Sequence, residues 1–263
     1  MTYDWSWDDV NFPEGTREFY NEIDRRFWRA AWFAHRPGEK IFSRFIDYPN
    51  LKGRRVLEIG CGAGALTAQL AKNGAEITAV DLTSHAVALT RRRLEVFGLP
   101  GDVRQVDAEN LDLPDESFDL VWSWGVIHAS SNTEKIIEHI YRVLRPGGET
   151  RLMVYHKSSI NYWINYMLIR GVLFGGLLWH TPQQLCDVYS DGLIAKAYTA
   201  ATFKEMLGKH FGKVRTEVCG QKDELWLIPG CKLKDKLVDA TPDALARPLT
   251  DRFGWYLWAL GTK

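Results

Sequence analysis

The residues best suited to chemistry lie early in the chain, where an apolar run ends in an acidic residue and three alternating glycines. Residues 56–59 have the composition of a buried strand, and a helical pattern opens at Ala65. Glu58 lies within this strand, and Gly60, Gly62 and Gly64 stand between the strand and the helix. Glycine permits a sharp turn at positive φ and lets a ligand approach the backbone without meeting a Cβ. Because open α/β sheets bind nucleotide-like ligands at such turns, the sequence predicts a cofactor that contains a nucleoside.

Two cofactor patterns compete for this turn. The turn satisfies the dinucleotide fingerprint G-x-G-x-x-A between Gly60 and Ala65, and Asp81 follows at about the spacing of the acid that binds the ribose of NAD. Gly64, however, stands one position earlier than that fingerprint places its third glycine. Glu58 also precedes the turn, which gives the alternative pattern E-x-G-x-G-x-G.

This second pattern resembles the first motif of class I S-adenosylmethionine-dependent methyltransferases, and the resemblance extends from residue 56 to residue 148. It includes two further strands with an acid near the end, an apolar fourth strand and a Pro-Gly-Gly turn before a fifth, at residues 77–81, 103–108, 117–123 and 144–148. Their order and spacing together are specific. The resemblance implies an α/β, Rossmann-like, doubly wound sheet of seven strands, mostly parallel, with an antiparallel C-terminal hairpin, N-terminal helices and a helical lid insertion.

The resemblance also implies S-adenosylmethionine as the cofactor and S-adenosylhomocysteine as its product. Asp81 would accept hydrogen bonds from the ribose hydroxyls, and Asp107 would meet the adenine amino group. Trp124 either stacks beside the adenine or lines the acceptor pocket. The glycines could serve strand-to-helix packing alone, but acids at three strand ends would then be coincidence. The predicted cofactor-binding residues are Glu58, Gly60, Cys61, Gly62, Gly64, Asp81, Leu82, Asp107, Ala108 and Trp124.

Methyl transfer from a sulfonium is an in-line displacement, so the main tasks of the protein are to align the reacting groups and to exclude water. Neither a metal nor a covalent nucleophile is required. An acceptor oxygen or nitrogen that must lose a proton would be served by a neutral histidine at about pH 7. The candidates are His128 after the fourth strand, His156 after the fifth, and Tyr20 on an N-terminal helix. A structural hydrogen bond or a core position is the alternative for each.

Composition narrows the function classes. Lys plus Arg and Asp plus Glu both count 33, so the formal net charge is zero, whereas a protein that grips nucleic acid usually carries a basic excess. The four cysteines include no C-x-x-C pair, which disfavours a zinc site or a redox dithiol. The first residues lack the basic and apolar regions of a secretory signal. We therefore expect a cytoplasmic protein without nucleic-acid partners.

Hydrophobic patterning divides the chain of 263 residues into four parts. We expect an N-terminal helical cap over residues 1–50, a cofactor-binding core over 51–156, an apolar helical lid over 157–200 and a C-terminal completion of the sheet over 201–263. The cap is predicted to contain helices at 16–33 and 38–46. The C-terminal part is predicted to contain a helix opened by a capping box at Thr202, strands at 213–218, 225–228 and 253–259, and an insertion near 230–250.

Residues 160–179 form an apolar segment about as long as a membrane span. Asn161, Asn165 and Arg170 interrupt it, and Gly175 with Gly176 would break a helix, so we expect no span. A lid over the active site is the preferred interpretation, while a buried packing helix or a homodimer contact remains open. The aromatic residues here and near the N-terminus predict an acceptor with apolar or aromatic character.

These observations favour a methyltransferase that acts on an oxygen or nitrogen of a small, partly apolar or aromatic metabolite. A protein or RNA methyltransferase is the enzymatic alternative. A NAD-dependent oxidoreductase would share the glycine turn. A non-catalytic S-adenosylmethionine-binding protein is the alternative from the class of binding modules.

Overall fold

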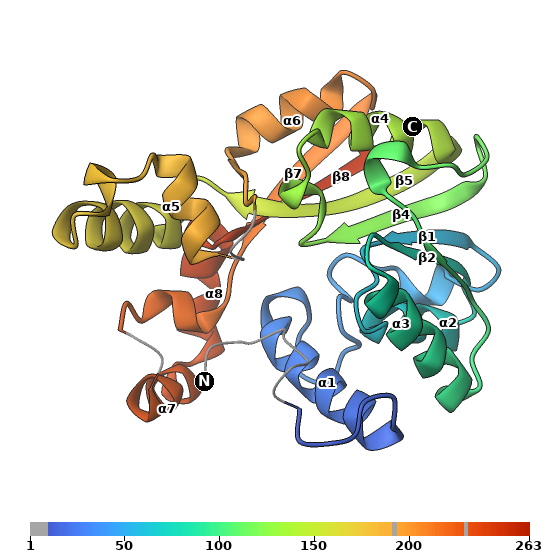
Figure 1. The fold of residues 1–263 in the computed structure, drawn as a ribbon, viewed down its shortest axis with the longest axis horizontal. Helices are drawn as coiled ribbons and strands as arrows, with labels where there is room; N and C mark the ends of the chain where they lie inside the picture. The colour runs from blue at the N-terminus through green and yellow to red at the C-terminus, as the bar shows by residue number, and fades with distance from the viewer. Residues whose placement is uncertain (1–9, 191–193, 229–230) are drawn as a thin grey trace.

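The computed structural model describes residues 10–190, 194–228 and 231–263. The strands in these residues are β1 Arg55–Ile59, β2 Glu76–Asp81, β3 Asp102–Gln105, β4 Phe118–Trp124, β5 Leu144–His156, β6 Ala197–Tyr198, β7 Lys213–Cys219 and β8 Tyr256–Thr262. They form one sheet in the order β3-β2-β1-β4-β5-β8-β7, and the short β6 pairs with the end of β5 (Figure 1). β1 to β5 pair in parallel, and β8 runs antiparallel between β5 and β7. The predicted mostly parallel sheet with an antiparallel C-terminal pair is therefore confirmed.

Helices cover both faces of this sheet, as the alternation of strand and helix patterns predicts. They are α2 Ala65–Lys72, α3 Ser84–Phe97, α4 Thr133–Val143 and α6 Ala200–Gly208. Figure 1 shows α2 and α3 on one side of the sheet and α4 and α6 on the other. Successive residues of β1 point to opposite faces, so Val56 packs in the core with Leu66 of α2, while Leu57 packs in the core with Ile136 of α4.

The N-terminal cap begins with α1 Arg17–Ala30, where the Thr16 side chain accepts from the Phe19 backbone N–H as the helix N-cap. A short 3-10 helix η1, Trp32–Ala34, follows. The helix predicted at 38–46 is wrong, because the structure has turns there and Phe42 lies at φ 57°. This left-handed residue stops a helix, and its fully buried ring packs against Trp122 with ring centroids 4.9 Å apart.

The C-terminal part differs from the prediction at two elements. α6 begins earlier than predicted, because Thr199 is its N-cap and Thr202 is the third helical residue of the same capping box. The strand predicted at 225–228 is wrong: a 3-10 helix, η7 Lys222–Leu225, begins this region. There the Glu224 carboxylate accepts from the backbone N–H of Gln221 and of Trp255, both at 2.7 Å, and so joins the start of η7 to the residue before β8.

Two helical segments project from the sheet on the left of Figure 1. The first, which we call the 161–189 lobe, follows β5 and consists of the π-helix η5 Asn161–Leu173, the 3-10 helix η6 Gly176–Leu178 and α5 Pro182–Tyr189. The second lies between β7 and β8 and contains α7 Lys232–Ala240 and α8 Asp243–Phe253. Among the described residues, no helix combines the length and the apolarity that crossing a bilayer requires.

Candidate active site

The turn between β1 and α2 has the backbone that its glycines predict. Gly60, Gly62 and Gly64 lie at φ 83°, 52° and 72°. A Cβ on Gly60 would lie 2.1 Å from Cγ2 of Val126, and one on Gly64 would lie 2.9 Å from Oγ1 of Thr90. Two of the three glycines are therefore required by contacts within this chain, in addition to any approach of a ligand.

Asp81 at the end of β2 holds the same turn from the neighbouring strand. Its carboxylate accepts from the backbone N–H of Gly62 at 3.1 Å, and from both the backbone N–H and the hydroxyl of Thr83 at 2.9 Å. Leu82 beside it is 65% exposed. Because a carboxylate offers about four lone-pair sites, Asp81 keeps acceptor capacity for a ligand while it fixes the loop.

Asp107 follows β3 at the same edge of the sheet and is exposed. Its carboxylate accepts from the backbone N–H of Glu109 at 2.8 Å and from the side-chain amide of Asn110 at 2.7 Å, as the N-cap of the 3-10 helix η3 Ala108–Asn110. The predicted acids of β1, β2 and β3 thus stand at successive strand ends along one edge.

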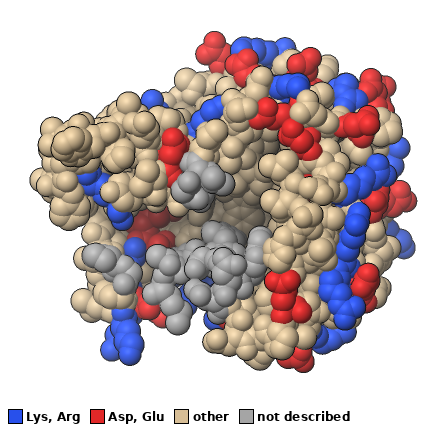
Figure 2. Space-filling view, in the orientation of Figure 1, with Lys and Arg blue, Asp and Glu red and all other residues tan. Residues whose placement is uncertain are grey.

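A cavity of about 280 Å³ opens beside the glycine turn. Its walls come from α1, the β1–α2 turn, the ends of β4 and β5 and the start of β8: Ile23, Arg26, Phe27, Glu58, Gly60, Cys61, Gly62, Ala63, Ala65, Leu66, Trp122, Trp124, Gly125, Met153, Tyr155 and Tyr256. Figure 2 shows a hollow in the face of the molecule between the 161–189 lobe and the sheet domain. Five predicted cofactor residues line the cavity, namely Glu58, Gly60, Cys61, Gly62 and Trp124. The other five, Gly64, Asp81, Leu82, Asp107 and Ala108, lie outside this lining.

Glu58 is the one acidic side chain among the residues that line this cavity. It is 4% exposed, and its carboxyl accepts from the hydroxyl of Thr67 at 2.6 Å. Burial raises the pKa of Glu58 to about 8, and the nearby charge of Asp81 acts in the same direction. A cationic ligand group placed against Glu58 would favour its ionised form, so the position suits an ammonium group.

Cys61 in the turn is buried, and burial raises the pKa of its thiol to about 12. The thiol is therefore neutral near neutral pH, and a neutral thiol is a weak nucleophile. This agrees with a small packing residue rather than with redox or covalent chemistry.

The wall of the cavity opposite the turn is aromatic. The Phe27 ring of α1 lies 5.0 Å from the Trp124 ring, centroid to centroid, and the Phe42 ring lies 4.4 Å from Trp124 on another side. Tyr155 stacks on Trp255 at 4.5 Å. Arg26 is the one basic lining residue, and its guanidinium Nε donates to Glu22 at 3.0 Å, the pairing that their helical spacing predicts. The chamber is thus mainly apolar, with Arg26 as a basic group and Glu58 as a carboxyl whose burial favours the protonated form.

The structure places none of the three candidate catalytic side chains in the cavity lining. His128 is fully buried, with its ring 3.9 Å from that of Tyr155. His156 lies with Nδ1 3.0 Å from the Gly254 carbonyl, and burial lowers its pKa, so the imidazole is neutral and donates to that carbonyl. Tyr20 is fully buried and donates its hydroxyl to the Leu89 carbonyl at 2.8 Å, so it packs α1 onto α3 instead of capping the cavity.

Several lining residues were missed by sequence reasoning. Ile23 and Phe27 lie within the helix predicted at 16–33, but the helical pattern does not indicate what the buried face of that helix covers. Arg26, Met153 and Tyr256 carry no local signal, because they meet only when the start, middle and end of the chain fold together.

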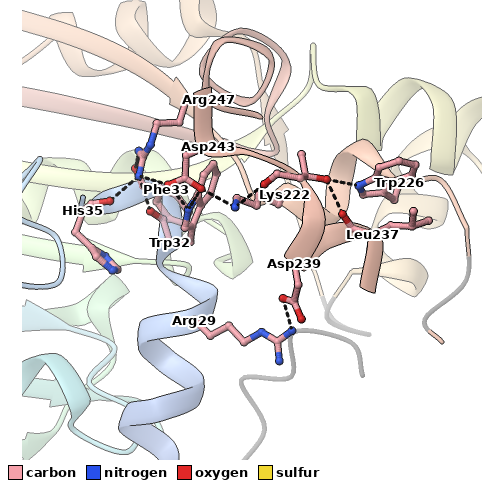
Figure 3. Close-up of polar contacts among 11 residues, drawn as sticks. Arg29, Trp32, Phe33, His35, Lys222, Trp226, Leu237, Asp239, Asp243 and Arg247 are labelled. Atoms are coloured by element: carbon pink, nitrogen blue, oxygen red, sulfur yellow. Dashed lines mark hydrogen bonds and ion pairs between the residues drawn. The ribbon is translucent and has the colours of Figure 1, made fainter. Parts of the chain in front are cut away.

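Two attachments hold α1 over the cavity. At one end the indole Nε1 of Trp32 donates to the carboxylate of Asp243 on α8, at 3.2 Å to the nearer oxygen. Lys222 forms an ion pair with Asp243 at 2.6 Å, and Arg247 donates to the His35 carbonyl at 2.7 Å (Figure 3). We call Trp32, Lys222, Asp243 and Arg247 the Trp32–Asp243 network. It joins the N-terminal cap to the segment between β7 and β8.

The second attachment of α1 uses Arg93 of α3, which is 1% exposed. Arg93 forms an ion pair with Asp24 of α1 and donates at 3.0 Å to the carbonyl of Ala63 in the glycine turn. One buried guanidinium therefore couples the cap to the turn that lines the cavity.

Comparison with known proteins agrees with this geometry. The family model described as "Methyltransferase domain" matches residues 57–152. The ubiquinone biosynthesis O-methyltransferase of Dechloromonas aromatica is 30% identical over 220 residues, which cover 76% of this chain and 94% of that protein. The phosphatidylethanolamine N-methyltransferase of Cereibacter sphaeroides is 36% identical over 108 residues, and the match spans 40% of this chain but only 53% of that protein's length.

A solved structure shows the same fold at low identity. Magnesium protoporphyrin IX methyltransferase from Synechocystis, with S-adenosylhomocysteine bound, superimposes with a TM-score of 0.52 at 16% identity and covers 82% of this chain and 76% of its own. The fold, the glycine turn and the match over 94% of the ubiquinone biosynthesis O-methyltransferase together define the class of this protein. The chain belongs to the S-adenosylmethionine-dependent methyltransferases.

The family implies S-adenosylmethionine as cofactor, and the residues of the site fit it. Gly62 presents backbone at positive φ on the cavity wall. Glu58 offers a buried carboxyl for an ammonium group, and Asp81 offers acceptors for hydroxyl groups at the next strand end.

Proposed function

We propose that this protein transfers the methyl group of S-adenosylmethionine to an oxygen or nitrogen of a small, partly apolar or aromatic, lipid-like metabolite. The observation that carries the proposal is the composition of the cavity beside the glycine turn. Aromatic and aliphatic side chains make up most of its walls, and Arg26 and Glu58 are its one basic and one acidic residue. A charged, compact acceptor would lose its hydration there without gaining enough partners.

When bound, the cofactor supplies an electrophilic methyl group on a sulfonium. The residues of this chain hold the cofactor and the acceptor and orient them toward each other. The glycine turn, Glu58 and Asp81 fix one side of the site, and Phe27, Trp124 and Tyr155 wall the other. Because displacement at a methyl carbon needs alignment and a dry site, these rigid aromatic walls supply the main catalytic contribution, through orientation and exclusion of water.

Proton removal is assigned to none of the three predicted catalytic residues. No histidine in the described part of the chain lines the cavity, and the hydroxyl of Tyr20 is held by a backbone carbonyl. We infer that none of these three residues acts as the general base, and that alignment carries the rate.

Two named relatives support the lipid-like character of the acceptor. One bears the name of a phospholipid N-methyltransferase and the other that of a ubiquinone biosynthesis O-methyltransferase. Their names include both nitrogen and oxygen as the methylated atom, so the proposal keeps both.

The test follows a labelled methyl group from S-adenosylmethionine into a fractionated extract of the source organism. We expect label in the organic-solvent or small-molecule fraction. Label in precipitated protein or nucleic acid would reverse the choice of acceptor, and cofactor binding without label in any fraction would indicate a binding protein. Phe27→Ala should reduce the labelling while leaving cofactor affinity unchanged, whereas Phe12→Ala, at a 45% exposed phenylalanine outside the cavity lining, should change neither.

A further inference from the structure

The tip of the 161–189 lobe exposes large apolar side chains that no described residue covers. Phe174, Leu178 and Trp179 are 81%, 80% and 84% exposed. The same segment also exposes Trp163, Leu168, Val172, Leu173 and Leu177. Contiguous apolar surface of this kind marks a site of interaction, because soluble proteins seldom leave it uncovered.

Basic charge slightly outweighs acidic charge at the lobe. Its charged side chains are Arg170 and Asp187, and Lys157 directly precedes it. Asp187 accepts from the Gln183 side chain at 2.7 Å and from the Ala195 backbone N–H at 2.8 Å, so its carboxylate is occupied within the fold. Figure 2 shows the lobe as a mostly uncharged surface with charged side chains at its edge. The Arg170 guanidinium lies 4.0 Å over the Tyr189 ring, which holds the charge beside the apolar surface. An apolar and aromatic surface with a basic group beside it complements a bilayer that carries anionic headgroups.

The shape of the lobe favours the same partner. It projects from the sheet domain as a separate protrusion (Figure 1). A protein partner for this tip would need a concave surface that matches it, whereas a bilayer accepts a convex apolar tip without a preformed cavity. Tryptophan and phenylalanine at the tip are the residue types that settle at a membrane interface.

An aromatic chain leads from the lobe to the cavity. Tyr166 of η5 contacts Trp255 with ring centroids 5.5 Å apart, and Trp255 stacks at 4.5 Å on Tyr155, which lines the cavity. A surface that engages the tip is therefore connected through packed side chains to the acceptor chamber.

We propose that the tip of the 161–189 lobe docks on the surface of a lipid bilayer that contains anionic lipids, and that it does so to reach a membrane-dissolved acceptor. The second half of this proposal rests on the proposed function, whereas the docking itself does not. Phe174 and Trp179 enter the headgroup boundary, and Arg170 lies against the anionic surface.

The test is sedimentation of the full-length protein with vesicles. One set contains an equal mixture of phosphatidylglycerol and phosphatidylcholine, and the other contains phosphatidylcholine alone. We expect cosedimentation with the mixed vesicles, weaker binding to phosphatidylcholine and a decrease with added salt. Phe174→Ser combined with Trp179→Ser should lower the partition coefficient about 100-fold, because each buried apolar side chain contributes roughly one factor of ten.

Leu245→Ser combined with Leu249→Ser on α8 is the matched control, since it removes exposed apolar side chains outside the lobe. It should bind vesicles as the unaltered protein does. Equal loss in both variants, or binding to neither vesicle, would overturn the proposal. A concentration-dependent dimer in solution that the tip substitution abolishes would assign the tip to a second copy instead. Unchanged binding of S-adenosylmethionine in each variant separates this result from a failure of the proposed function.

Discussion

The indole Nε1 of Trp32 donates to both carboxylate oxygens of Asp243, at 3.3 and 3.2 Å, across a sequence separation of 211 residues. Lys222 and Arg247 lie over the Trp32 ring, 5.0 and 4.6 Å from its centroid. Through this network (Figure 3) the N-terminal cap and α8 are linked on the side of the molecule where α1 covers the cavity. Its bonds should therefore influence acceptor binding more than cofactor binding.

Trp32→Phe tests this coupling, because it keeps an aromatic ring at this position and removes the indole N–H donor. We expect the free energy of unfolding to fall by about 1–3 kcal/mol, since the variant leaves a partly buried carboxylate with one donor fewer. The KM for the acceptor should rise, and the affinity for S-adenosylmethionine should stay the same. Asp239→Asn is the control: it alters the exposed ion pair with Arg29, which joins α1 to α7 at 3.5 Å, and should change stability by less than about 1 kcal/mol. Equal effects of the two substitutions on acceptor KM would contradict the account.

The second attachment of α1 predicts a larger stability effect. Asp24→Asn removes the charge that compensates the buried Arg93 guanidinium, and it should lower the free energy of unfolding by about 3 kcal/mol. Because Arg93 also holds the Ala63 carbonyl, cofactor affinity should fall as well. Arg92→Gln, which removes the exposed ion pair with Glu95, is the neighbouring control and should cost less than about 1 kcal/mol. Urea unfolding measures the free energy of unfolding of both variants, and calorimetric titration measures their cofactor affinity. Equal losses of stability and affinity in the two variants would be evidence against a coupling role for Arg93.

Steric packing at the glycine turn can be separated from backbone strain. Gly60→Ala places a Cβ 2.1 Å from Val126 Cγ2 at φ 83°, so it should cost about 3 kcal/mol from strain and overpacking together. Gly147→Ala has a similar φ of 76° with no atom within 4 Å, and strain alone should cost about 1 kcal/mol. Val126→Ala should restore part of the stability in the Gly60→Ala background. Absence of any restoration would show that Val126 is not the obstacle.

The buried carboxyl of Glu58 predicts a pH dependence with a definite sign. Its pKa is about 8 in the folded protein against 4.5 as the ordinary value, so the folded state binds more protons between these pH values. The free energy of unfolding should therefore fall as pH rises from about 4.5 to about 8. Glu58→Gln removes this contribution, so its stability relative to the unaltered protein should increase across that window, while it binds S-adenosylmethionine more weakly. A stability difference that stays constant with pH would contradict the raised pKa.

The core of the fold could be predicted because its signals are local. Val56 and Leu57 point to opposite faces of the sheet. Glu58 and the glycines after it mark the end of a strand, and this signal does not depend on distant parts of the chain. The predictions that were wrong concern residues whose conformation depends on partners far away in the sequence. A helix was predicted at 38–46 from residue types, but Phe42 adopts a left-handed backbone and its ring packs against the distant residue Trp122.

The predictions for the candidate site differ in the same way between local signals and distant partners. Gly60, Gly62 and Trp124 were predicted and line the cavity, because they stand at the ends of the parallel neighbours β1 and β4. His128 and Tyr20 were chosen by residue type and position, yet the first lies against Tyr155 and the second donates to Leu89. Sequence position does not specify on which side of a sheet edge a side chain becomes buried.

Calorimetric titration with S-adenosylmethionine, for the unaltered protein, Asp81→Ala and Asp102→Ala, tests the central claim most directly. Asp102 is an exposed acid on the adjacent strand β3, where it pairs with Arg104, so it serves as the matched control. We predict one site in the unaltered protein, unchanged affinity for Asp102→Ala and about a 10-fold to 100-fold loss for Asp81→Ala, because a charge-assisted hydrogen bond to a ribose hydroxyl and the bond that holds the Gly62 N–H would both disappear. Unfolding midpoints of the variants establish that both are folded. Equal affinity of a folded Asp81→Ala protein, or binding of NAD in place of S-adenosylmethionine, would contradict the assignment of the site.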